Sequence, residues 1–268
     1  MTVPVPAFDG SIPALYDRYL GPLIFEPYAR DVARRVADLK PQRVLEVACG
    51  SGQVTRQLHR VLSAHSTIVA TDLSASMLAY AQSTLPAVTR VRWQEADGMS
   101  LPFDDGAFDV VVCQFGLMFF PDPATGLREM ARVLASGGHA FVSTWDSMQA
   151  NGFARVVHER VSGMFTHDPP QFMHVPFHLH DRAALHALAT RNGFASADVH
   201  ALPSDTEGPS ARDAARGFVR GNPLAVQLQE RGANLDAVED SVTIGLAQLG
   251  GVAPLRLSLH AVLVHAQR

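Results

Sequence analysis

The sequence predicts an α/β fold built on a doubly wound, Rossmann-like parallel sheet with helices on both of its faces. Short, fully apolar segments rich in β-branched residues alternate along the chain with segments of helical periodicity, which is typical of a parallel sheet buried on both faces. A Gly-x-Gly turn joins the first strand directly to a helix, as at the ligand-binding edge of such folds. The expected strands cover residues 43–49, 67–71, 91–95, 109–113 and 139–145, and the expected helices cover 52–63, 74–85, 123–134 and 181–192.

Local signals mark where some of these elements begin and end. Ser74 is expected to cap the helix that follows it, and Pro86 to stop that helix. Upstream of the sheet, the spacing of apolar residues over 13–39 indicates a helix. We expect that helix to be interrupted near Pro22 and Pro27, because proline has no backbone N–H to donate.

The second half of the chain departs from regular alternation. Residues 197–202 and 256–265 alternate like strands, and the last of these is expected to fold back antiparallel. Two stretches, 147–180 and 203–254, are too long to be simple connections in a compact domain. We interpret both as helical lids above the carboxyl ends of the strands, packed on each other around an apolar pocket.

Composition excludes several classes of function. The net charge is -4 and no run of Lys or Arg stands out, so no nucleic-acid partner is expected. No apolar run is long enough to span a bilayer, and the N-terminus lacks the features of a signal peptide. The two cysteines, Cys49 and Cys113, suit a reducing compartment, so a cytoplasmic location is expected. A homodimer is left open.

The turn after the first strand carries an unusual acid. Gly50 and Gly52 remove side chains that would keep a ligand away from the backbone. A dinucleotide fingerprint would place a third glycine where Thr55 stands. Glu46 lies inside the strand, where its negative charge suits a ligand with an ammonium and a sulfonium better than a pyrophosphate. This turn therefore favours a cationic ligand over a dinucleotide.

Three further strand ends carry polar residues. Asp72 closes the second strand, where a carboxylate can accept hydrogen bonds from both ribose hydroxyls. Asp97 follows the third strand and can accept from an exocyclic amine of adenine. Gln114 ends the fourth strand and is followed by aromatic residues. Carboxyl strand ends meet at one edge of a doubly wound sheet, so these side chains are expected around one ligand.

In this order the pieces resemble the motifs of the class I methyltransferases that depend on S-adenosylmethionine (SAM). The matching segments are E-x-A-C-G-S-G, the acid at the second strand end, E-A-D-G-x-x-L-P-F, F-D-V-V and R-E-M-A-R-V-L-x-x-G-G, within residues 43–145. The resemblance is closest to the small-molecule branch that includes ubiquinone and menaquinone biosynthesis methyltransferases. It implies SAM as cofactor and seven strands in the order 3-2-1-4-5-7-6, with strand 7 antiparallel. Ser136 departs from the proline usual before the glycine pair, which affects only a turn.

The resemblance also implies how the chain is divided and which residues hold SAM. The expected divisions are an N-terminal helical cap at 1–42, a SAM-binding core at 43–146, a first lid at 147–180, a core helix and strand at 181–202, a second lid at 203–254 and a final strand at 255–268. The expected SAM-binding residues are Tyr16, Tyr19, Glu46, Ala48, Gly50, Gly52, Asp72, Leu73, Met77, Ala96, Asp97, Gly98, Gln114 and Phe115.

The acceptor of the methyl group is less defined. The candidates for a general base are His174, His178 and His180, with surface or packing roles favoured. No metal site is expected, because Pro176 breaks any helix that would align His174 with His178. Gln114 and Phe115 stand where methyltransferases of base amines or protein glutamine carry Asn-Pro-Pro-Tyr. The absence of that motif argues against those substrates.

The apolar residues of the first lid, such as Phe153, Phe172 and Phe177, form either part of the core or a pocket wall. As a pocket wall they indicate a small, flat or hydrophobic acceptor, with methylation on oxygen or carbon expected over nitrogen.

Two alternatives remain at this point. A nicotinamide-dependent oxidoreductase would share the fold, but Thr55 and Glu46 count against it. A protein that binds SAM without catalysis would share every motif, and only an activity screen would separate it from an enzyme.

Overall fold

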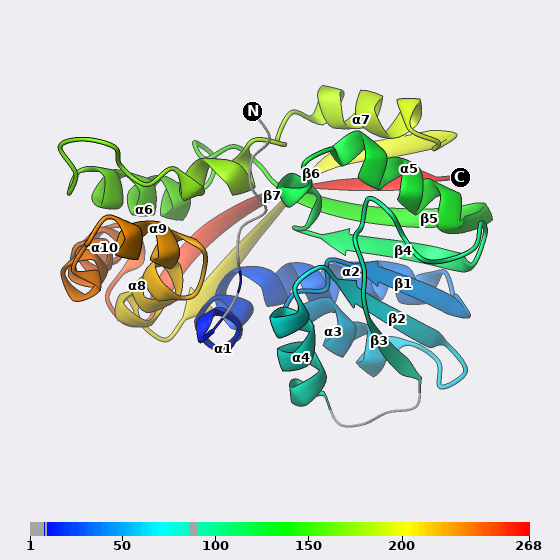
Figure 1. Cartoon of the computed structure of the whole chain (residues 1–268), viewed down its shortest axis with the longest axis horizontal. Helices are drawn as coiled ribbons and strands as arrows, with labels where there is room; N and C mark the ends of the chain where they lie inside the picture. The colour runs from blue at the N-terminus through cyan, green and yellow to red at the C-terminus, as the bar shows by residue number, and fades with distance from the viewer. Residues whose placement is uncertain (1–7, 9, 86–89) are drawn as a thin grey trace.

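The computed structural model describes residues 8, 10–85 and 90–268, and it confirms the predicted fold class. One sheet of seven strands has the order β3-β2-β1-β4-β5-β7-β6 (Figure 1). β7 pairs antiparallel with both β5 and β6, and the other pairs are parallel. The strands are β1 (Arg43–Val47), β2 (Thr67–Asp72), β3 (Val91–Glu95), β4 (Phe108–Gln114), β5 (Leu134–Trp145), β6 (Ser196–Gly208) and β7 (Leu255–Gln267).

Helices cover both faces of the sheet. The helices are α1 (Ile12–Leu15), η1 (Tyr16–Phe25), α2 (Glu26–Asp38), α3 (Gln53–Val61), α4 (Ala75–Thr84), η2 (Leu117–Phe119), α5 (Pro123–Val133), α6 (Gly152–Ser162), η3 (Phe172–Phe177), α7 (Arg182–Arg191), α8 (Ala211–Arg220), α9 (Leu224–Glu230) and α10 (Leu235–Gly250). α2 and α3 share one buried apolar cluster with the sheet, and α5 and α7 share another. As predicted, Ser74 caps α4, because its hydroxyl accepts the N–H of Met77 at 3.2 Å. Pro86 lies outside the described residues.

The N-terminal helices differ from the prediction. Neither Pro22 nor Pro27 interrupts them, since α1, η1 and α2 follow one another without a gap. η1 is a π-helix, and its end is closed by the N–H of Glu26, which donates to the carbonyl of Gly21 five residues earlier. Pro27 lies in the first turn of α2, where a backbone N–H would have no helical partner.

β6 is longer than the predicted strand at 197–202. It continues to Gly208, with Pro203 opposite His260 of β7. β6 is an edge strand, so the missing N–H of Pro203 is tolerated and its outward side chains are polar. The sequence beyond residue 202 therefore looks like a loop although it is paired. The second lid segment begins after Gly208 instead of at residue 203.

The two lid segments pack on each other beyond the carboxyl end of the sheet, on the left of Figure 1. Arg160 of α6 donates to the Gln248 side chain of α10 at 2.7 Å. Apolar residues of α6, η3, α8 and α10 form one cluster with Phe115 and Trp145, which follow β4 and end β5. The lids therefore cover the strand ends that carry the predicted site.

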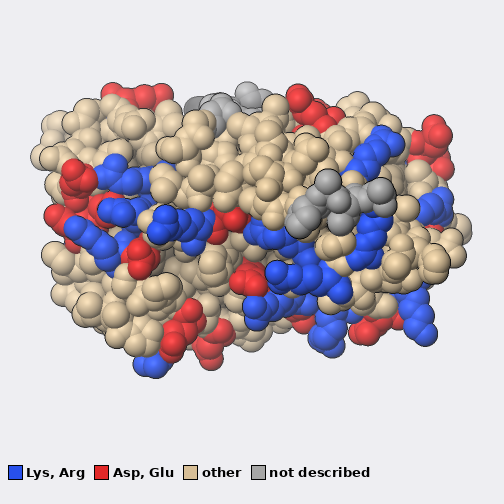
Figure 2. Space-filling view, turned by 90° about the horizontal axis from the view of Figure 1, so that it is seen from below, with Lys and Arg blue, Asp and Glu red and all other residues tan. Residues whose placement is uncertain are grey.

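The surface gives two general results. No helix among the described residues is long and apolar enough to cross a membrane. Lys and Arg side chains gather on the face seen in Figure 2, with Asp and Glu side chains among them. On α2, for example, Arg30 pairs with Glu26 at 2.7 Å and Arg35 pairs with Asp31 at 2.6 Å. These basic side chains are thus partly neutralised by acids on the same helix.

Candidate functional site

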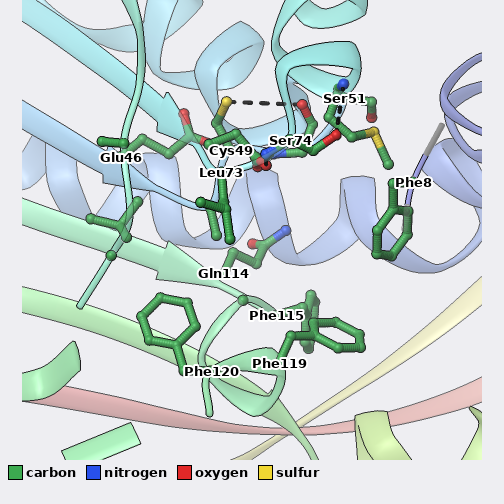
Figure 3. A pocket seen from close by; sticks show the side chains of 18 of the residues that line it. Phe8, Glu46, Cys49, Ser51, Leu73, Ser74, Gln114, Phe115, Phe119 and Phe120 are labelled. Atoms are coloured by element: carbon green, nitrogen blue, oxygen red, sulfur yellow. Dashed lines mark hydrogen bonds between the residues drawn. The ribbon is translucent and has the colours of Figure 1, made fainter. Parts of the chain in front are cut away.

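A cavity of about 420 Å³ lies at the carboxyl ends of β1, β2, β3 and β4 (Figure 3). The polar side chains predicted at these four strand ends all line it, namely Glu46, Asp72, Asp97 and Gln114. Other predicted residues on its wall are Tyr16, Ala48, Gly50, Leu73, Met77, Ala96, Gly98 and Phe115. The parallel sheet thus brings together residues that lie up to 99 positions apart in the chain, from Tyr16 to Phe115.

Glu46 is a buried carboxylate, only 2% exposed, at the floor of this cavity. The hydroxyl of Thr55, in α3, donates to its Oε2 at 2.6 Å. Burial raises the pKa of Glu46 to about 8, although the Thr55 hydrogen bond acts in the opposite direction. Thr55 therefore has a role that the sequence did not indicate: it orients the acid of the preceding strand.

Asp72 fixes the glycine turn. Its Oδ2 accepts the N–H of Gly50 at 2.7 Å, and its Oδ1 accepts the N–H of Ser74 at 2.9 Å. Gly50 has a φ of +55°, and a Cβ added there would meet no atom within 4 Å, so this backbone faces open space. The carboxylate of Asp72 keeps acceptor capacity beside these bonds, because a carboxylate can accept about four hydrogen bonds. Burial raises the pKa of Asp72, opposed by these backbone donors.

The turn after β3 is fixed in a similar way. Asp97 Oδ1 accepts the N–H of Met99 at 2.8 Å. Gly98 is required by its neighbour, since a Cβ there would lie 2.4 Å from the ring of Phe120. The cavity is therefore bounded on this side by a tight turn and an aromatic ring.

Gln114 lies at the centre of the cavity, between the glycine turn and the aromatic rings (Figure 3). Its Nε2 donates to the carbonyl of Phe25 at 3.3 Å, while its Oε1 is buried without a hydrogen-bond partner in the described part of the chain. Phe115 has a φ of +55°, which is rare for a bulky residue, and stacks on Trp145 with ring centres 4.1 Å apart. The unpaired Oε1 of Gln114 is therefore available to accept a hydrogen bond from a ligand.

Two predicted residues do not line the cavity: Gly52 supports the turn, and Tyr19 faces elsewhere. A Cβ at Gly52 would lie 3.1 Å from Ala81 of α4, and its φ of +82° suits glycine. Tyr16 stacks on Phe25 at 4.7 Å on the cavity wall. Tyr19 instead contacts Gly217 of α8 and Arg18. The two tyrosines diverge because the π-helical turn is wider than the α-helical turn assumed for them.

The three histidines proposed as candidate bases are exposed and absent from the cavity wall. A ring nitrogen of His178 contacts the carbonyl of Met118 at 2.9 Å, and one of His180 contacts the carbonyl of Phe177 at 2.8 Å. The ring of His174 lies 4.5 Å from that of His158. The apolar residues of η3 turn inward and leave these histidines outside. No three His, Cys, Asp or Glu side chains of the described residues converge as metal ligands.

Asp17 of η1 is a contributor that sequence reasoning missed. Its Oδ1 accepts hydrogen bonds from Ser51 at 2.8 Å, Gln53 at 2.9 Å and Arg56 at 2.6 Å. Its Oδ2 accepts from Tyr80 at 3.2 Å. These partners belong to the glycine turn, α3 and α4, so the hydrogen bonds of Asp17 hold η1 against the elements around the cavity. A lone acid in a helical segment gives no sequence signal for such distant partners.

A second, smaller chamber of about 60 Å³ adjoins the cavity. The two share an aromatic wall made of Phe8, Tyr16, Phe25, Phe115 and Phe119. The chamber extends under the lids, where its lining is almost wholly apolar. The site therefore consists of a polar compartment at the strand ends and an apolar compartment beneath the lids.

Residues 45–142 match the family model described as a methyltransferase domain. This segment is similar to the methyltransferase family. It includes the glycine turn and every strand-end side chain described above, which confirms the family resemblance of the sequence motifs.

Curated relatives and solved structures match this domain. The chain is 38% identical over 114 residues to the ubiquinone/menaquinone biosynthesis C-methyltransferase UbiE of Xylella fastidiosa, covering 41% of this chain and 45% of the relative. It is 33% identical over 126 residues to a demethylmenaquinone methyltransferase of Staphylococcus aureus, covering 46% and 52%. The chain thus spans about half the length of these relatives. The structure of the YcgJ protein of Bacillus subtilis superposes with a TM-score of 0.59 at 18% identity, covering 90% of this chain and 98% of that one, and shares the fold.

Proposed function

We propose that this chain is a SAM-dependent methyltransferase that acts on a small, flat and apolar acceptor, on oxygen or carbon in preference to nitrogen. One observation carries the proposal. Acids from three successive strand ends, Glu46, Asp72 and Asp97, line one cavity beside a glycine turn whose backbone is open to a ligand. SAM offers a cationic methionine part, a ribose diol and an adenine amine, which are donors for these three acceptors in that order.

The unpaired atoms of the cavity fit SAM. Gln114 Oε1 is a buried acceptor without a partner among the described residues, and SAM carries a sulfonium with electron-poor carbon–hydrogen bonds beside it. The lone pairs left on Asp72 suit ribose hydroxyls. When bound, SAM supplies a methyl group on a sulfonium that is ready to leave. An electron pair of the acceptor would form the new bond to that carbon, and sulfur would keep the electrons of the broken carbon–sulfur bond.

The residues of the chain contribute orientation and exclusion of water. Asp72 and Thr55 hold the turn and the acid that would fix the cofactor. Phe115 and Phe119 stand between the two compartments, where the reacting atoms would meet. The lids keep this junction apolar, which favours a displacement that loses charge.

The relatives support a small-molecule acceptor. Both curated relatives are named for methyl transfer in the biosynthesis of quinones, one of them on carbon. A carbon or oxygen acceptor is therefore proposed here as well. The family model ends at residue 142, before both lids, so the acceptor of this chain is proposed from its own apolar chamber.

A nicotinamide-dependent oxidoreductase and a non-catalytic SAM-binding protein would use this cavity differently. A nicotinamide enzyme would place a pyrophosphate at the glycine turn, close to Glu46, and the ionised form of this buried acid would repel it. A non-catalytic SAM-binding protein would bind SAM without turnover.

The test is methyl transfer from SAM with a deuterated methyl group. The protein is incubated with this SAM and a panel of small phenols, enols and amines, and products are detected by their mass shift. We expect labelled products from phenols or enols together with S-adenosylhomocysteine (SAH), and much less product from Asp72→Ala when SAM is limiting. SAM binding with no labelled product from any acceptor class would favour the non-catalytic alternative.

A further inference from the structure

Among the described residues, the lining of the apolar chamber under the lids has no ionisable group that could act as a base. Its lining consists of Phe8, Tyr16, Leu20, Ile24, Phe25, Phe115, Phe119, Trp145, Phe153, Phe172, Met173, Pro176, Phe177, Phe218 and Asn222. None of these described residues is His, Asp, Glu, Lys or Cys. The candidate histidines lie on the outer side of the lid.

The few polar groups of the chamber are also unsuited to take a proton. Burial, together with Asp72 and Asp17, raises the pKa of Tyr16 far above neutral pH, so its phenol keeps its proton. Asn222 is occupied, since its Nδ2 donates to the carbonyl of Phe218 at 2.9 Å and its Oδ1 accepts the N–H of Leu224 at 2.9 Å. An acceptor in this chamber must therefore arrive without the proton that methylation replaces.

The positive charge of the sulfonium also favours an acceptor that enters as an anion. An oxygen or carbon anion and a sulfonium carry opposite charges, and their reaction leaves two neutral products. An amine would become an ammonium inside an apolar chamber, where it would find no carboxylate and no base to take its proton. The described lining therefore favours an anion that is neutralised on reaction.

The size of the chamber limits the acceptor. A water molecule needs roughly 10–15 Å³ of such volume. The 60 Å³ present therefore holds about four to six non-hydrogen atoms, at most the carbons of one ring, and the substituents of that ring would extend into the adjoining cavity. The far wall is closed by Phe153 and Phe218, which stack with ring centres 5.4 Å apart.

We propose that the acceptor is a single-ring phenol or enol that already carries its negative charge when it enters the chamber, so that the enzyme supplies no base. This inference rests on the proposed function, because the sulfonium of SAM provides the positive charge that pairs with the anion.

Two probes of the same shape test it. 4-Nitrophenol is largely a phenolate slightly above neutral pH, whereas 4-nitroaniline stays neutral. Each is titrated into the protein saturated with SAH, which is uncharged at sulfur, or with sinefungin, which carries an ammonium near that position. We expect nitrophenolate to bind about tenfold more tightly to the sinefungin complex than to the SAH complex. The affinity of nitroaniline should not depend on the cofactor analogue.

Matched variants locate the binding. Phe218→Leu enlarges the chamber and should weaken nitrophenolate binding while admitting 1-naphthol. Phe194→Leu, at a residue that is buried in the core cluster shared by α5 and α7, should change neither. Three results would overturn the inference. They are equal binding of nitrophenolate to the two analogue complexes, tighter binding of nitroaniline than of nitrophenolate, and no binding of either probe to the complex that holds SAH. Failure of SAH and sinefungin to bind would instead overturn the proposed function.

Discussion

The hydroxyl of Thr55 lies 2.6 Å from Glu46 Oε2 and donates a hydrogen bond to this buried carboxylate. Thr55 stands where a dinucleotide-binding fold would have its third glycine, and the contact explains why a side chain is useful there. The pair holds an acid beneath the glycine turn with a pKa of about 8. The protonation of Glu46 should therefore be linked to the binding of a cationic ligand.

The affinity for SAM should rise with pH up to about pH 8. Below that value Glu46 is protonated in the free protein, and a bound cation favours its ionised form. Binding then releases a proton, so affinity increases as the pH rises toward the pKa of the free protein and levels off above it. Calorimetry in buffers of different ionisation enthalpy measures this release. Glu46→Gln should bind more weakly at about pH 8 and with a flatter profile. An equally steep profile in the variant would contradict this linkage.

Asp72→Ala should weaken SAM binding by roughly 1.5–3 kcal/mol, because it removes charge-assisted hydrogen bonds. It also frees the N–H of Gly50, so the turn loses its anchor. Asp72→Asn keeps one acceptor oxygen and should lose less. The thermal unfolding of both variants should stay cooperative, since the residue ends a strand at the edge of a cavity. If the dissociation constant of SAM is unchanged in Asp72→Ala, Asp72 only stabilises the turn and does not bind SAM.

Asp17→Ala should lower the free energy of unfolding by about 2–4 kcal/mol, because it leaves Arg56 without its ion-pair partner in a mostly buried setting. Arg30→Ala is the matched control. It removes an ion pair whose arginine side chain is 67% exposed, so the loss should stay below about 1 kcal/mol. Urea unfolding of both variants gives the comparison. Equal losses would mean that Asp17 does not fasten the N-terminal helix.

The lids should exchange backbone hydrogens faster than β1 and should become protected when SAH is added. α6, η3 and α8 line the apolar compartment and α10 packs on α6 and α8, whereas β1 lies in the interior of the sheet. Ligand binding should stabilise the closed arrangement of these segments. Hydrogen exchange with mass spectrometry resolves both regions. If SAH does not change the exchange of residues 147–180 and 209–254, these segments do not act as lids of the site.

Much of the fold was predictable because burial leaves a clear pattern. β1 and β4 have buried apolar centres, and the strand-end polar residues follow from the geometry of parallel sheets. The polar outer half of β6 could not be recognised, because an edge strand with exposed side chains resembles a loop. The π-helical turn of η1 has no sequence pattern of its own, so the sequence could not indicate that Tyr19 faces away from the cavity. The bonds of Asp17 depend on tertiary contacts that no local spacing encodes.

Titration calorimetry with SAM, SAH and NAD⁺ tests the central claim most directly. SAM and SAH should bind with micromolar dissociation constants, about -8 kcal/mol, and NAD⁺ should give no heat of binding. The reason is Glu46, because the cationic groups of SAM stabilise its ionised form whereas a pyrophosphate would destabilise it. Binding of NAD⁺ without binding of SAM or SAH would contradict the account.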